Sequence, residues 1–183
     1  MSVGSLDSLS RQHKGLKIYF KYILSLKSTV LCPIIYSEMQ LSAFSDYSLR
    51  TLMHAALRAP KRVTIDEVTE AFGINRNHLV KVVHLLGSNG LLATQRGVGG
   101  GFTLALPAEK IVLGRVVRLT EADETVITCH DRDNHQCRIF PVCLLKGVLG
   151  EAAAAFFAVL DSYSVADLVK RPADMRELLK MER

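Results

Sequence analysis

Apolar residues recur at helical spacing in the segment SDYSLRTLMHAALRAP, which begins at residue 45 of the 183-residue chain. They fall at i, i+3, i+4, i+7 and i+8, which are Leu49, Leu52, Met53, Ala56 and Leu57. This spacing predicts an amphipathic helix whose buried face carries those residues. We expect Ser45 to be its N-cap, Asp46 to lie in its first turn and Pro60 to follow its end.

Two shorter helical patterns follow, and the turn sequence GIN separates them. Thr64 and Glu67 have the spacing of a capping box before the first helix, and Gly73 allows a tight turn after it. Asn75 is expected to cap the second helix and Gly90 to end it. Two short helices joined in this way predict a helix-turn-helix.

The rest of the chain predicts one hairpin and three helical segments. LLATQRGVGGGFTLALP indicates two strands around a glycine-rich tip, which after a helix-turn-helix is a wing. KIVLGRVVRLTE, VCLLKGVLGEAAAAFFAVLDSY and SVADLVK indicate helices. The predicted fold is mainly α with a small β-wing. It has a winged helix-turn-helix domain at 39–107, a cysteine loop with a long helix at 108–170, and a polar tail at 171–183.

The first 38 residues differ in pattern from the residues that follow. They carry five Lys or Arg and two acidic residues, and their longest apolar run, VLCPIIY, is only seven residues. That run is too short for a membrane span, so we expect no membrane partner. We expect residues 1–38 to be a disordered extension or a mis-assigned start, with Met39 as the natural first residue.

The formal net charge of +5 makes an anionic partner plausible and directs attention to the second helix of the pair. Opposite its apolar face that helix carries Arg76, Asn77, His78, Lys81 and His84. Basic and amide side chains at the start of a recognition helix are the types that contact base edges and phosphates. The sequence therefore predicts binding to double-stranded DNA, and the alternative is an ordinary solvated helix face.

The wing and the first helix of the pair add further candidate DNA contacts. Arg96 lies at the base of the wing, where it could enter the minor groove. Gly99 and Gly100 at the tip would let the backbone approach phosphates closely. We include Thr64, at the start of the first helix, in the same surface. The alternative for the wing is a plain hairpin turn.

Three of the four cysteines lie in CHDRDNHQCRIFPVC, at Cys129, Cys137 and Cys143. The spacing C-x7-C-x5-C differs from the paired C-x2-C of zinc fingers. Three interpretations stay open on spacing alone: zinc held with His130 or His135, a dithiol switch, and an iron–sulfur cluster whose fourth ligand comes from elsewhere. The sequence shows no convincing secretion signal, which favours a reducing compartment.

The long helix after Cys143 has an apolar stripe that includes Phe156, Phe157 and Leu160 and is wider than one small domain needs. It is either an internal core helix or a surface that packs against a second copy in a twofold dimer. The chain carries no nucleophile elbow, P-loop or dinucleotide fingerprint, so we expect no enzymatic activity.

Four segments occur together and in order: MQLSAFSDYSLRTLMHAAL, INRNHLVKVVHLLGSNG, RGVGGGFTLA and the three-cysteine loop. Over about residues 39–170 they resemble the winged-helix iron–sulfur repressors. The resemblance implies a cytoplasmic, homodimeric regulator that binds operator DNA through residues 66–89. It also implies an iron–sulfur cluster on Cys129, Cys137 and Cys143. NRNHLVKVVHLL favours the nitric-oxide-sensing subgroup, which implies nitric oxide as the signal and nitrosative-stress protection genes as the targets.

The resemblance leaves the fourth ligand and the cluster type unsettled. The IscR-type pattern expects a histidine three residues after the third cysteine, where this chain has Lys146. The nitric-oxide-sensing pattern places a carboxylate in FSDYSLR, which implies Asp46 of the partner subunit, oriented by Arg50. Helix-start chemistry alone is the alternative role for Asp46. We favour [2Fe–2S] over [4Fe–4S]. The alternative functions are an iron-status regulator of the IscR type and a non-DNA-binding redox module.

Overall fold

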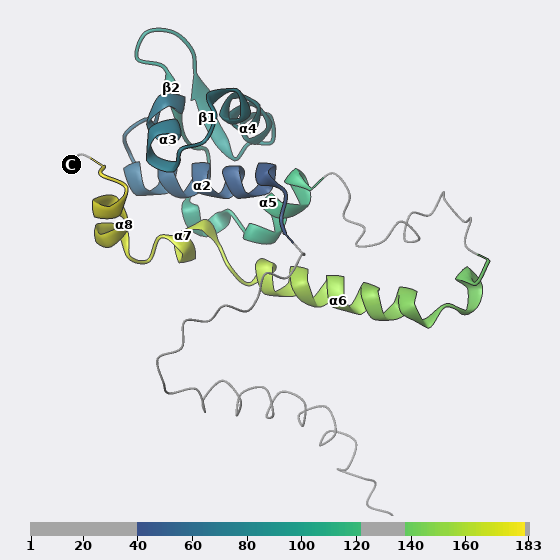
Figure 1. Cartoon of the computed structure of the whole chain (residues 1–183). Coiled ribbons are helices and arrows are strands. Elements are labelled where there is room, and N and C mark those ends of the chain that lie inside the picture. Colours follow the sequence, from purple (N-terminus) through teal and green to yellow (C-terminus); the bar gives the residue numbers. More distant parts are fainter. Residues whose placement is uncertain (1–39, 122–137, 182–183) are drawn as a thin grey trace, which may run out of the picture. The chain divides into compact units, whose positions relative to one another are not determined.

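Helix α2, Ala43–Arg58, is the element around which the computed structural model is arranged (Figure 1). It contacts α3, α4, α5, α7 and β2. The structure describes residues 40–121 and 138–181, so the expected N-terminal extension lies outside the described residues. The other elements are α3 Ile65–Phe72, α4 Arg76–Ser88, β1 Leu92–Gln95, β2 Gly101–Leu104, η1 Ala108–Lys110, α5 Leu113–Thr120, η3 Phe140–Val142, α6 Leu144–Asp161, α7 Val165–Leu168 and α8 Pro172–Leu178.

Helix α2 buries more than its apolar stripe. The predicted residues Leu52 and Leu57 are buried, whereas Leu49, Met53 and Ala56 are only partly buried. The fully buried set also includes small polar residues that the hydrophobic pattern excluded: Ser45, Ser48 and Thr51. They tolerate burial because they have partners close by. Ser48 and Thr51, for example, donate to the carbonyls of Phe44 and Tyr47 at 2.8 and 2.7 Å.

The predicted N-cap of α2 is wrong by three residues. The cap is Ser42, whose hydroxyl accepts from the amide of Ser45 at 3.2 Å. Ser45 itself is inside the helix and fully buried, and its hydroxyl lies 2.6 Å from that of Thr120 on α5. Capping chemistry looks alike at both serines in the sequence, and packing against α5 decides between them.

The helix-turn-helix forms as the sequence predicts. The capping box is present, because the Thr64 hydroxyl accepts from the Glu67 amide while the Glu67 carboxylate accepts from the Thr64 amide. Asn75 caps α4 by accepting from the amide of Asn77 at 2.8 Å. Between the helices Gly73 adopts a φ of 65°, the left-handed conformation that the turn needs. The buried face of α4 is Leu79, Val82, Val83 and Leu86, as expected.

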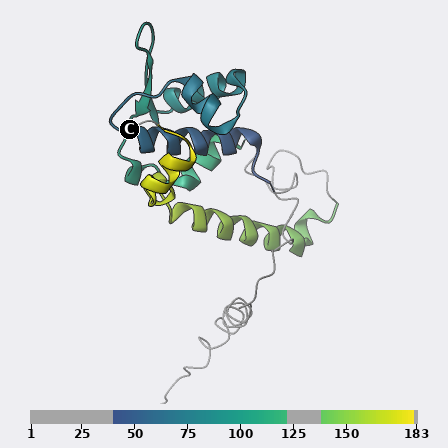
Figure 2. The same ribbon diagram turned by 60° about the vertical axis from the view of Figure 1, so that its left-hand side comes forward.

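The wing is a two-stranded antiparallel hairpin that projects from the helices (Figures 1 and 2). Leu92 pairs with Leu104 and Gln95 pairs with Gly101. The base of the wing is held by Val63 and Phe102, which exchange backbone hydrogen bonds of 2.9 and 2.8 Å. Gly101 lies beside this bridge, and a Cβ there would come within 2.5 Å of the Val63 carbonyl oxygen. The wing therefore needs glycine at this position for close backbone approach.

Helix α6 is not an internal core helix, since none of its residues is buried. Its C-terminal end is joined to α5 by Arg118, which donates to both carboxylate oxygens of Asp161 at 2.8 and 2.7 Å and lies over the Phe157 ring. In Figures 1 and 2 the N-terminal half of α6 extends beyond α5. The exposed large apolar residues of α6 are Leu144, Leu145, Val148, Phe156 and Val159.

The segment after residue 171, expected as a polar tail, contains the short helix α8. Pro172 starts it, at the position where proline is best tolerated in a helix. Arg176 on α8 donates two hydrogen bonds, of 3.0 and 2.7 Å, to the carbonyl of Leu57 in the last turn of α2. The negative end of the helix dipole favours a cation here, and the two hydrogen bonds tie the C-terminal segment to α2.

We predict that Gly101→Ala destabilises the protein by about 2 kcal/mol or more, because the added Cβ meets the Val63 carbonyl and the φ of 152° is unfavourable for alanine. The measurement is urea unfolding followed by circular dichroism. Gly147→Ala is the control: it lies within α6 with no neighbour inside 4 Å, so it should be neutral or stabilise by about 0.5–1 kcal/mol. Equal effects of the two changes would contradict the close-approach argument.

We also predict a pH dependence from Glu67. Burial raises the pKa of this carboxyl, but hydrogen bonds from Thr64 and the Arg58 guanidinium outweigh it and lower the pKa below its usual value of 4.5. A lowered folded-state pKa contributes stability above about pH 4.5 that is lost as pH falls through the folded value. Thermal melts of wild type and Glu67→Gln should therefore differ, by about 0.5–1 kcal/mol, at pH 7 and converge at lower pH. A constant difference across that range would disprove the assignment.

Candidate functional site

A groove of about 500 Å³ lies between the recognition helix α4, the start of α3 and the wing. Its walls include Thr64, Arg76, His84, Arg96 and Gly100, five of the residues that the sequence singled out for DNA. The start of α3, helix α4 and the wing thus bring predicted DNA contacts to one concave surface. The remaining predicted residues, Asn77, His78, Lys81 and Gly99, are exposed but do not line the groove.

The predicted DNA-contacting residues of α4 point in different directions around the helix. Arg76 and His84 face the wing side, while Asn77 and Lys81 lie on the outer surface of the same helix. His78 lies toward α2, where its ring meets that of Tyr47 edge-on with centroids 6.0 Å apart. Arg76 Nε donates to Asp66 Oδ1 at 2.8 Å, with both side chains largely exposed. This acidic partner on α3 was not anticipated, and it fixes the guanidinium at the entrance of the groove.

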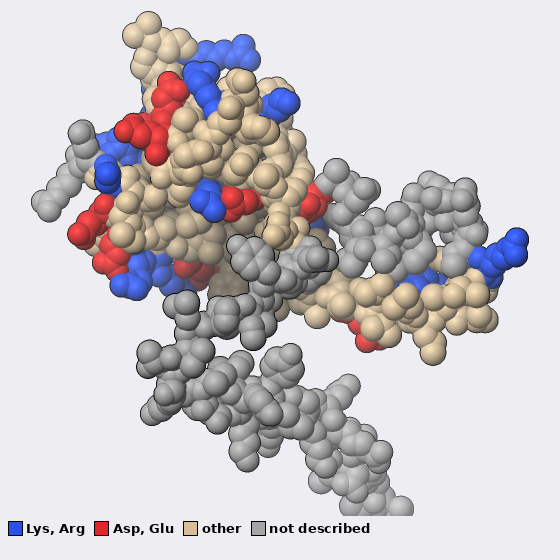
Figure 3. Space-filling view, viewed as in Figure 1, with Lys and Arg blue, Asp and Glu red and all other residues tan. Residues whose placement is uncertain are grey.

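Basic side chains appear at the end of the visible face where α4 and the wing lie, and acidic side chains lie over α3 (Figure 3). The sequence reasoning missed Thr94 and Gln95, which also line the groove from β1. Strand alternation would not have identified both, since it places Thr94 on the face of the buried Leu92, whereas the three residues after Leu92 are all exposed. An amide at Gln95 adds a donor and an acceptor of the kind that reads base edges.

Two of the four wing glycines are required by close contacts within the protein. A Cβ at Gly100 would lie 2.7 Å from the carbonyl oxygen of Gly97, and Gly101 faces Val63 as described above. The glycine run therefore does not by itself indicate phosphate contact. The tip instead presents Val98, whose side chain is fully exposed.

Asp46 lies in the first turn of α2, and Arg50 one turn later holds it as the sequence suggested. Arg50 Nε donates to Asp46 Oδ1 at 2.9 Å, and both side chains are a little under half exposed. The Arg50 guanidinium also lies over the ring of Phe72, the last residue of α3, at 5.7 Å from the centroid. The carboxylate is therefore accessible and fixed in direction, which suits a ligand that serves another group.

The start of the cysteine loop is attached to the same end of α2. Glu121, the last described residue before the loop, accepts hydrogen bonds from the Ser42 amide at 2.8 Å and from the Ser45 hydroxyl. Burial raises the pKa of the Glu121 carboxyl, but the hydrogen bonds from Ser45 and Ser42 outweigh this effect. The pKa therefore lies below its usual value. Glu121 therefore anchors the loop within one turn of Asp46.

Of the three predicted cluster cysteines, Cys143 is described, and Cys129 and Cys137 lie outside the described residues. Cys143 is partly buried and occupies the N-cap position of α6. A thiolate there would lie at the positive end of the helix dipole, which favours negative charge. Thiolates are the donors that iron accepts in iron–sulfur clusters, so the residue type at Cys143 fits the prediction.

The described part of the chain contains no helix both long and apolar enough to cross a membrane. Within the same residues no preformed group of three or more metal-binding side chains exists.

Comparison with known proteins gives consistent matches. Residues 41–171 match the sequence profile of the Rrf2 family, described as iron-dependent transcriptional regulators. The HTH-type transcriptional regulator NsrR of Bacillus subtilis (strain 168) is 45% identical over 145 residues, which cover 79% of this chain and 99% of that protein. The protein of the same name from Shouchella clausii is 42% identical, with 79% and 97% covered.

Solved structures support the fold alone, since their identities are low. T. potens IscR aligns with a TM-score of 0.58 at 22% identity, covering 72% of this chain and 87% of that chain. The oxidised form of Staphylococcus aureus CymR aligns with a TM-score of 0.57 at 22% identity, covering 72% and 97%. The relatives are transcriptional regulators and not enzymes. On these matches, the chain belongs to the Rrf2 family of iron-dependent transcriptional regulators.

Proposed function

We propose that this chain is a cytoplasmic, homodimeric repressor that binds operator DNA and releases it when nitric oxide reacts with its iron–sulfur cluster. The observation that carries the proposal is the groove formed by α3, α4 and the wing, because five of the predicted DNA contacts converge on this one surface. The regulators named NsrR at 42–45% identity support the choice within the family.

DNA binding would use two kinds of contact. Arg76, His84 and Gln95 lie where base edges can be reached from the groove, and Lys81 and Asn77 lie on the outer side of α4 where phosphates pass. Arg96 and the exposed Val98 at the wing would face the minor groove. The exposed apolar face of α6 would pack against a second copy, which places two recognition helices on a near-palindromic site.

Cys129, Cys137 and Cys143 would hold the cluster, with Asp46 of the partner subunit as the fourth ligand. When bound, the cluster supplies iron that nitric oxide can attack. We favour [2Fe–2S] and keep [4Fe–4S] as the alternative. Asp46 has a second partner within its own chain, Arg50, so the carboxylate can exchange between iron and guanidinium without losing all of its charge compensation.

The chain links this ligand to the DNA surface by direct contacts. Arg50 touches Phe72 at the end of α3, and Tyr47, next to Asp46, touches His78 on α4. A shift of the first turn of α2 would therefore move both helices of the DNA-binding pair. Because one lost base-pair contact costs about 1–3 kcal/mol, a small displacement would suffice to release DNA.

We predict that Cys137→Ser removes the visible absorbance of anaerobically purified protein and weakens operator binding, because one cluster ligand is lost. The thermal transition of the winged helix-turn-helix should remain. Cys32→Ser is the matched control, since Cys32 lies outside the resemblance, and it should keep both colour and repression. A coloured, fully active Cys137→Ser protein would exclude the cluster assignment.

The same preparation tests the signal. Nitric oxide added to the wild-type protein should weaken binding to an operator fragment selected from a random-sequence library. Iron chelation of growing cells is the comparison arm. Release that follows iron status and ignores nitric oxide would favour the IscR-type alternative.

We predict that Lys81→Ala weakens binding to specific and non-specific DNA by a similar factor and lowers the slope of log K against log salt by about one, because one phosphate contact is lost. Lys110→Ala is the control, since Lys110 lies on η1 and not on α4 or in the groove. Fluorescence anisotropy at several salt concentrations gives both slopes. An unchanged slope for Lys81→Ala would mean that this side chain touches no phosphate.

A further inference from the structure

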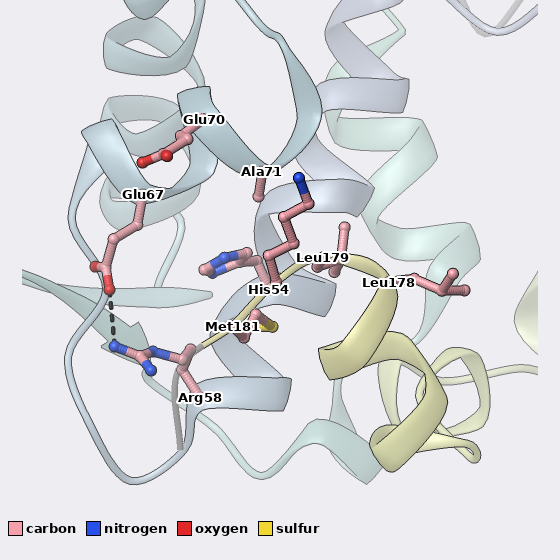
Figure 4. Close-up of a pocket in the computed structure, with 9 residues that line it drawn as sticks. His54, Arg58, Glu67, Glu70, Ala71, Leu178, Leu179 and Met181 are labelled. Carbon is pink, nitrogen blue, oxygen red and sulfur yellow. Dashed lines mark hydrogen bonds and ion pairs between the residues drawn. The ribbon is translucent and has the colours of Figure 1, made fainter.

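A second cavity, of about 480 Å³, lies between the C-terminal half of α2, helix α3 and the segment that follows α8 (Figure 4). It shares no lining residue with the DNA groove. Its volume is within the range of small-molecule sites in proteins. The walls are His54, Arg58, Glu67, Glu70, Ala71, Leu178, Leu179, Lys180 and Met181.

His54 is the unusual side chain in this cavity. It is 2% exposed, and its Nδ1 has no hydrogen-bond partner among the described residues. Figure 4 shows its ring with Glu67 and Glu70 on one side and Leu178 and Leu179 on the other. Burial lowers the pKa of His54, so the imidazole is neutral near pH 7. A buried nitrogen without a partner costs free energy, which a polar group of a ligand would recover.

Two of the charged walls are already committed to the fold. Arg58 donates to Glu67 Oε1 at 2.8 Å, and Glu67 Oε2 accepts from the Thr64 amide at 2.6 Å. Lys180 and Glu70 supply a second pair of opposite charges around the same space. Lys180 has a φ of 51°, the only positive φ among the described residues other than glycine, and its amide bonds to Glu177 at 3.0 Å. This left-handed residue ends α8, since it follows the C-cap Leu179 and the Met181 amide donates to the Arg176 carbonyl at 2.9 Å.

We propose that this cavity binds a small zwitterion with a short apolar side chain, an aliphatic L-α-amino acid. Its carboxylate would pair with Lys180, and its ammonium would donate to Glu70. Nδ1 of His54 is enclosed by protein atoms, so a turn of the ring would bring it to the ammonium. Its side chain would lie against Ala71, Leu179 and Met181. Because Arg58 and Glu67 already pair with each other, Glu70 and Lys180 are the charged walls that face a ligand, and a molecule that carries both charges complements them.

The position of the site gives the ligand a structural effect. Its walls join α2, α3 and the C-terminal segment, which Arg176 already ties to α2. A ligand that binds only the folded state raises the melting temperature by mass action. This site uses neither the cysteines nor the groove, so it does not depend on the proposed function.

The experiment is a thermal-shift screen of the full-length protein against the twenty proteinogenic L-amino acids, one at a time, followed by calorimetry of those that raise the melting temperature. We expect one or more aliphatic amino acids to bind with a Kd of about 1 mM or tighter. For a leucine response, isocaproate lacks the ammonium and isoamylamine lacks the carboxylate, so neither should bind. Absence of any shift, or equal binding of either analogue, overturns the proposal.

Variants of exposed residues keep the test independent of folding. Glu70→Gln and Lys180→Gln should each weaken amino-acid binding roughly tenfold or more, since each removes a charge-assisted hydrogen bond. Glu109→Gln and Lys110→Gln on η1 are the matched controls and should bind like wild type. If the Glu70→Gln and Lys180→Gln variants bind the amino acid as tightly as wild type, the assignment is overturned. Operator binding of the same samples tests the proposed function separately. A failure of amino-acid binding can therefore be distinguished from a failure of DNA binding.

Discussion

The burial of α2 on more than one face is the constraint on which the rest of the structure depends. An amphipathic helix at the edge of a domain would contact the DNA-binding helices alone, but α2 also packs against α5 and α7. Small polar side chains make this second contact possible, because Ser48 and Thr51 bond to their own helix and Ser45 bonds to Thr120. The recognition helix and the start of the cysteine loop are consequently attached to one rigid element.

Under the proposed function, this arrangement would connect a cluster ligand at one end of α2 with the DNA-binding helices. The first turn of α2 holds Asp46, and Glu121, the last described residue before the loop, bonds to Ser42 and Ser45 at the same end of α2. Because Arg50 and Tyr47 contact α3 and α4 respectively, the turn has no freedom to move alone. The contacts of Arg50 and Tyr47 would thus both orient the Asp46 carboxylate and connect the first turn of α2 to α3 and α4.

Local signals in the sequence predicted most elements, and tertiary packing accounts for the errors. The capping box at Thr64, the cap at Asn75 and the turn at Gly73 are decided within a few residues, so the sequence alone predicts them. Ser42 and Ser45 are both suitable caps, and only contact with α5 separates them. Helix α8 was missed because its seven residues carry little periodicity, and its anchor at Leu57 is 119 residues away in the chain. The sequence predicted DNA contacts at Thr64, on α4 and on the wing, but the groove that some of them line, and the places of Gln95 and Asp66 in it, depend on how these elements pack.

The wing illustrates why residue type alone gives an uncertain indication of function. A run of glycines first suggested close approach to phosphates, yet Gly100 and Gly101 are required by Gly97 and Val63 within the protein. The same backbone bridge at Val63 and Phe102 holds the wing against the end of α2 and the start of α3. The orientation of the wing is therefore set by the fold, and any sequence preference must come from the side chains that it presents, Arg96, Val98 and Gln95. Glycines give the hairpin its shape, and Gln95, Arg96 and Val98 are the side chains that the proposal assigns to DNA.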